Sequence, residues 1–181
     1  MSSILKTGLD YDVLPAGLLE IAKSHLRIDG TYDDAYVADA IRRAINWFER
    51  VTHVSVNPVT WIWKPDAGNW CNGLVPVPVS PADSFTVEAG GLDVSAGYSL
   101  VTMSTFGIGL YALSGAHTAG MAVTIPSGFA SAAALDPGIT DAVLRYTAHL
   151  YENREILVMG SDALSPDWMN SVIATYWMPR A

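Results

Sequence analysis

Residues 31–52, which read TYDDAYVADAIRRAINWFERVT, decide the fold of this chain. Thr31 and Asp34 have the spacing of a capping box, with an acid in the place of its usual partner, and Asp33 and Asp34 suit the positive end of a helix dipole. The stretch therefore predicts an amphipathic helix that ends near Thr52. Its apolar side chains fall on one stripe: Val37, Ile41, Ala44, Ile45, Phe48 and Val51.

Three further helices are expected around this one. A first helix over residues 16–26 follows a proline, which suits a helix start because its missing N–H needs no partner there. Asp136 and Pro137 are an N-cap acid and a first-turn proline, and they predict a long helix over residues 138–157. A last helix over residues 165–176 is expected to end before the proline at position 179.

The middle of the chain has a different composition, rich in Gly, Pro, Val, Thr and Trp and nearly free of Lys and Arg. Its β-branched and aromatic runs, separated by glycines and prolines, predict short strands. We therefore predict an α+β fold: a small, mainly α-helical bundle of four helices with an inserted antiparallel β layer. The expected strands cover residues 59–63, 85–89, 92–94, 98–102, 110–113 and 121–125, with 75–79 as an extended edge. We expect one domain over 1–181, with helices about 15–54 and 136–177 and the β insertion about 57–130.

Composition excludes several classes of protein. Half of the 181 residues are hydrophobic and 15% are charged, which is ordinary for a folded domain. The net charge of −8 disfavours sequence-specific binding to nucleic acid, which needs a basic surface. The lone cysteine, Cys71, cannot form an intrachain disulfide. The sequence has neither a signal peptide nor an apolar run of membrane-spanning length, so we expect a soluble protein with no membrane contact.

Residues with catalytic or ligand-binding spacing are missing from the sequence. His149 and Asn153 lie four apart, but no second histidine completes a metal pair. Residues 107–112 match a loose GxGxxA pattern, which indicates a glycine-rich strand connection because no helix is expected to follow. No nucleophile elbow GxSxG occurs. We therefore expect no catalytic, cofactor-binding or metal-binding residues, no cofactor, and no enzymatic activity.

Two features indicate binding to other molecules. Trp61, Trp63 and Trp70 lie close together in the sequence, so a carbohydrate- or peptide-binding module with a tryptophan-rich β surface is the alternative function. Core packing is the commoner use of such aromatic residues. The third helix has a second apolar face, formed by Leu144, Ala148 and Tyr151, and we expect this face to line a subunit interface.

Two segments together carry a resemblance to a known family. Residues 25–37, HLRIDGTYDDAYV, look like the helix–turn–helix signature of the head–tail connector proteins of tailed phages, also called adaptor or head-completion proteins. Residues 148–155, AHLYENRE, look like the signature of a later helix in that family. The order of helices, β insertion and final helices also matches. The resemblance covers about residues 13–56 and 121–181 in motif, and the β insertion in character only.

The resemblance implies a structural virion protein at the head–tail junction, assembled in the host cytoplasm. Such connectors form a ring under the portal protein, usually a dodecamer, and present a surface to a tail-side stopper or tail-completion protein. Double-stranded DNA passes through the ring during packaging and exit without specific binding, which suits a negatively charged protein.

Two groups of residues receive roles in this reading. The C-terminal tail contains aromatic residues and an arginine, types that concentrate binding energy at interfaces, and the resemblance implies that it docks on the portal. The residues concerned are Tyr176, Trp177, Met178 and Arg180. The excess acid of the chain is expected to lie toward the DNA channel, with Asp83, Glu88 and Asp93 on the β insertion as candidates.

Overall fold

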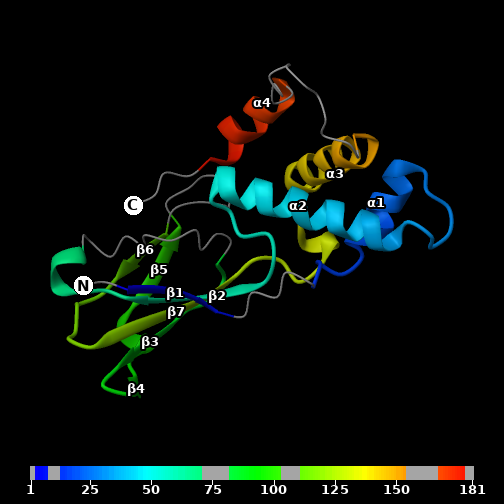
Figure 1. Cartoon of the computed structure of the whole chain (residues 1–181). Helices are drawn as coiled ribbons and strands as arrows, with labels where there is room; N and C mark the ends of the chain where they lie inside the picture. The colour runs from blue at the N-terminus through cyan, green and yellow to red at the C-terminus, as the bar shows by residue number, and fades with distance from the viewer. Residues whose placement is uncertain (1–2, 8–12, 71–81, 103–110, 154–166, 178–181) are drawn as a thin grey trace. The chain divides into compact units, whose positions relative to one another are not determined.

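The computed structural model describes residues 3–7, 13–70, 82–102, 111–153 and 167–177, and it divides the chain into two compact units (Figure 1). A β unit contains residues 53–128 and the two chain ends, 1–10 and 178–181. A helical unit contains residues 11–52 and 129–177. The residues of each unit pack mainly with one another. The boundaries between the units fall near the positions where the composition of the sequence changes.

The helical unit has four α-helices within its described residues, as predicted: α1 (Leu18–Leu26), α2 (Asp34–Thr52), α3 (Pro137–Glu152) and α4 (Asp167–Tyr176). Helix α2 packs against the other three, and α3 also contacts α1 and α4 (Figure 1). The predicted stripe of α2 is buried, apart from a partly exposed Val51. The core is completed from the other helices by Leu18, Ala22, Ile139, Ala142, Val143, Leu144 and Met169.

The start of α3 confirms the signal in the sequence. The Asp136 carboxylate accepts a hydrogen bond from the Gly138 N–H at 2.9 Å, and Pro137 occupies the first turn. Such a cap satisfies an N–H group that would otherwise lack a partner in the helix. Helix α3 ends at Glu152, before the expected Leu157, and residues 154–166 lie outside the described part of the chain.

The β unit contains a five-stranded antiparallel sheet in the order β1-β2-β7-β3-β4 and a separate two-stranded ribbon, β5-β6. The mixed α+β fold is thus confirmed. The strands cover Ser3–Thr7 (β1), Val59–Lys64 (β2), Thr86–Ala89 (β3), Leu92–Asp93 (β4), Ser99–Thr102 (β5), Tyr111–Ser114 (β6) and Met121–Ser127 (β7). Strand β1 was not predicted, and the expected extended edge at 75–79 lies outside the described residues.

Alternation along β7 builds the core of the β unit. Met121, Val123 and Ile125 are buried on one face of the strand, as the two-residue period requires. Trp63, Val87 and Leu113 complete the same cluster. Gly128, just after β7, has a φ of +90°, and a Cβ there would overlap the backbone carbonyl of Asn57. Glycine is therefore required where the chain leaves the sheet.

Candidate interaction surfaces

The two sequence signatures lie against each other in the helical unit. The Tyr151 hydroxyl donates a hydrogen bond to the Asp33 carboxylate at 2.6 Å, and the Tyr36 hydroxyl donates to the Leu150 carbonyl at 3.1 Å. The rings of Tyr36 and Tyr151 pack with their centres 5.7 Å apart. The start of α2 is therefore fixed to the end of α3 by residues that belong to the two signatures.

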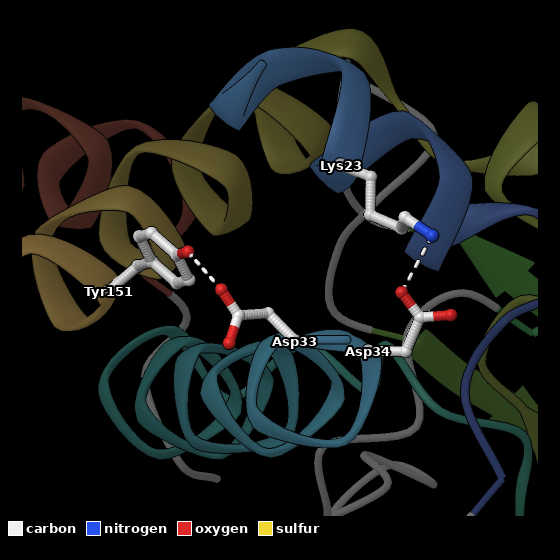
Figure 2. Close-up of polar contacts among 4 residues, drawn as sticks. All are labelled: Lys23, Asp33, Asp34 and Tyr151. Carbon is white, nitrogen blue, oxygen red and sulfur yellow. Dashed lines mark hydrogen bonds and ion pairs between the residues drawn. The ribbon is translucent and has the colours of Figure 1, made fainter. Parts of the chain in front are cut away.

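The neighbouring carboxylate fixes α2 on its other side. Lys23, from α1, forms an ion pair with Asp34 at 2.6 Å, and both side chains are largely buried. Figure 2 shows Asp33 and Asp34 at the start of α2, directed to Tyr151 of α3 and Lys23 of α1. The sequence assigned both acids to the cap of their own helix. In the structure, the two acids also bind residues of α1 and α3. This role could not be predicted without knowing where those helices lie.

The second face of α3 is covered in part by the chain itself. Leu144 is 8% exposed and belongs to the core of the helical unit, where α1, α2 and α4 all contact α3. Ala148 is partly exposed, and the Tyr151 hydroxyl is bonded to Asp33. Leu144 was expected at a subunit interface, but its side chain is covered by the helices of its own chain. Replacing Leu144 would therefore perturb the core of the helical unit.

The last two described residues of the chain have opposite environments. The Tyr176 hydroxyl donates to the Asp136 carboxylate at 2.5 Å, and its ring packs edge-on against Phe48 with centres 5.7 Å apart. Burial, together with the Asp136 carboxylate, raises the pKa of Tyr176 well above its ordinary value. A Cβ on Gly138 would overlap this hydroxyl. Tyr176 is thus a structural anchor that completes the cap of α3.

Trp177, the next residue, is 54% exposed, and its backbone N–H donates to the Ile173 carbonyl at 2.7 Å. A half-exposed indole at the end of a helix is available to a partner, as a docking tail requires. Met178 and Arg180 lie outside the described residues. Of the expected docking residues, Trp177 is therefore exposed, whereas Tyr176 is packed and hydrogen-bonded within the helical unit.

The three acids proposed for a channel wall are all exposed: Asp83, Glu88 and Asp93. The Ser95 hydroxyl and backbone N–H both donate to the Asp93 carboxylate, and they hold its pKa below the usual value of an aspartate. Asp93 therefore stays ionised at neutral pH.

The tryptophans considered as a carbohydrate- or peptide-binding surface pack in or against the core of the β unit. Trp63 is fully buried and stacks on Trp70, with ring centres 5.7 Å apart. The Trp61 indole N–H donates to the Ser55 hydroxyl at 3.4 Å. Since Trp63 belongs to the core, the three indoles do not form one exposed surface, which weighs against the alternative function.

In the part of the chain that the structure describes, no group of three or more His, Cys, Asp or Glu side chains is arranged to hold a metal ion. None of the described helices is long and apolar enough to cross a membrane.

Three solved structures are similar to this chain over its length. One, described as the neck of an empty GTA particle computed with C6 symmetry, has a TM-score of 0.66 at 20% identity and covers 100% of this chain and 97% of its own. A chain from the virion of a native gene transfer agent (GTA) particle gives 0.66 at 23% identity, with the same coverage. A third, from the neck of a native GTA particle computed with C12 symmetry, gives 0.63 at 20% identity and covers 94% and 95%.

These likenesses show the class of fold: the chain shares its architecture with chains of gene transfer agent particles. The sequence itself matches no protein-family model and no curated protein.

Proposed function

We propose that this chain is a structural protein of the neck of a phage or phage-like particle. It forms a ring under the portal, extends the DNA channel and joins the head to the tail-side component, with no enzymatic activity and no cofactor. The observation that carries this proposal is the full-length likeness in fold to chains described as neck components. The two signatures of the connector family support it independently, because they were recognised in the sequence and pack together in the fold.

The C-terminal end supports a contact with the portal. Trp177 is exposed at the end of α4, while Tyr176 anchors that helix through Asp136. The anchor fixes the end of α4 within the helical unit, and the exposed indole provides the apolar group that a partner can bury. We propose that Trp177, followed by Met178 and Arg180, binds the portal.

The charge of the chain supports a passage for DNA. The net charge is −8, and Asp83 is exposed on the β unit. A ring multiplies each charge by the number of its copies, so a cationic wall would bind the phosphates of the passing duplex strongly. An acidic wall repels them and leaves the DNA free to move.

A deletion in the parent genome tests the proposed function. Without the gene, DNA-filled heads and free tails should accumulate separately, and supplying the wild-type chain should restore joined particles in electron micrographs. A chain carrying Trp177→Ala should fold normally and restore few joined particles. Normal particles assembled in the absence of the chain would overturn the proposal.

A further inference from the structure

The hairpin of β3 and β4 presents an apolar tip between acids. Gly90 and Gly91 form its turn with φ values of +60° and +81°, and Leu92, immediately after the turn, is 71% exposed. Glu88 and Asp93 are paired directly across the two strands, and both are exposed. Like charges directly opposite each other destabilise a hairpin, and an exposed leucine is costly in water. Both costs are relieved if a basic and apolar surface covers the tip.

Such a surface exists in the helical unit. A cleft of about 400 Å³ lies along α2 and α3. Its apolar part is formed by Trp47, Val51 and Tyr146, and the rings of Trp47 and Tyr146 pack with centres 4.7 Å apart. Its polar part is formed by Arg43, Asn46 and Arg50, which recur at helical spacing on one side of α2 and are all exposed.

The two arginines of this cleft differ in their surroundings. Arg43 forms an ion pair with Asp39 one turn earlier on the same helix. Arg50 makes no ion pair with any of the described residues. The cleft therefore combines an aromatic floor with a positive charge available for a carboxylate from another molecule.

We propose that the β3–β4 hairpin tip of one copy of this chain binds in the α2–α3 cleft of the next copy. Leu92 packs on the exposed surface of the paired Trp47 and Tyr146 rings. Glu88 and Asp93 meet Arg50 and Arg43. Successive side chains of a strand point to opposite faces, so Leu92 and the two acids leave the ribbon on different sides. Strand β3 is also paired with β7, so β4 is the open edge of the hairpin, and the long arginine side chains of the cleft reach around that edge.

This contact deepens the proposed function, because it rests on the ring and names the surfaces that form it. The hairpin and the cleft are different surfaces, so each copy offers one and accepts the other. Such a heterologous contact closes into a ring when the rotation between copies divides a full turn. Glu88 and Asp93 then face a neighbouring copy, and Asp83 remains the candidate for the channel wall.

Cross-linking between two differently labelled copies tests the contact directly. In the full-length chain with Cys71→Ser, one sample carries Ala96→Cys, beside the hairpin, and the other carries Asn46→Cys, at the cleft. A short bismaleimide should join the mixed pair. The matched control replaces Asn46→Cys by Tyr32→Cys, since Tyr32 is 99% exposed on the same helical unit and lies outside the cleft.

The expected yield for the mixed pair exceeds that of the control about tenfold. Arg50→Glu in the cleft copy should abolish this excess, and Glu88→Lys in the hairpin copy should restore it, which a merely structural effect of either change would not do. Equal yields for Asn46→Cys and Tyr32→Cys would overturn the inference, even if the chain assembles in necks. Loss of joined particles in Arg50→Glu with an unchanged cross-link would also overturn it, because the cleft then binds another virion protein.

Discussion

Removing the Tyr151 hydroxyl should remove the stabilising contact between the two signature segments and lower the free energy of unfolding. The group donates to Asp33 at 2.6 Å in a partly buried site. A hydrogen bond to a charged partner contributes about 1.5–3 kcal/mol, and partial exposure places this one near the lower value. Tyr151→Phe should therefore lower the free energy of unfolding by about 1.5 kcal/mol. For a chain of this size, that corresponds to a fall in Tm of about 3–6 °C.

Urea unfolding followed by circular dichroism at 222 nm measures this effect in the helices. A double-mutant cycle with Asp33→Ala isolates the contact from the other roles of the acid, and its coupling free energy should be about 1–2 kcal/mol. Tyr32→Phe is the matched control, because that hydroxyl is on a fully exposed side chain and its loss should cost nothing measurable. A coupling free energy near zero would refute the reasoning that these two segments stabilise each other.

Three further predictions concern the ends and edges of the two units. Trp177→Ala should change the free energy of unfolding by less than about 0.5 kcal/mol. Tyr176→Ala should lower it by about 2–3 kcal/mol in thermal unfolding, because it removes packed and hydrogen-bonded atoms. Equal losses for the two variants would contradict the role of Tyr176 as an anchor. Ser95→Ala should raise the pKa of Asp93 in an NMR titration, and an unchanged pKa would contradict its cause. Because folding lowers that pKa, the associated stability is present above about pH 4 and is lost as pH falls further, and the variant should lack this dependence. Gly128→Ala should destabilise the β unit by more than about 1 kcal/mol in urea unfolding, since φ is +90° there and a neighbouring carbonyl occupies the Cβ position. A substitution without effect on stability would refute the close approach of the Asn57 carbonyl to Gly128.

The helices could be predicted because their signals are local. The apolar stripe of α2 and the Asp136–Pro137 start of α3 each depend on residues within a few positions of one another. The mixed fold class followed from the contrast between these segments and the strand-like middle. Strand β1 could not be found in this way, because Ser3–Thr7 is short and is defined by pairing with β2, almost sixty residues later.

The roles of individual side chains were harder to predict than the elements that contain them. Leu144 was assigned to an outer face because the position of α1 beside α3 is a tertiary property that periodicity does not contain. Tyr176 was grouped with the docking tail, although its hydroxyl completes the cap at Asp136 forty residues earlier. The cleft along α2 was missed because Tyr146 joins it from another helix, although the arginine and tryptophan spacing on α2 was a visible signal.

A reconstruction of the neck of the particle encoded by the parent genome tests the central claim most directly. The account predicts that this chain occupies a closed ring immediately beneath the portal, with the C-terminal residues directed to the portal and an acidic wall around the DNA. Particles that contain the chain elsewhere, or that complete their neck without it, would contradict the account.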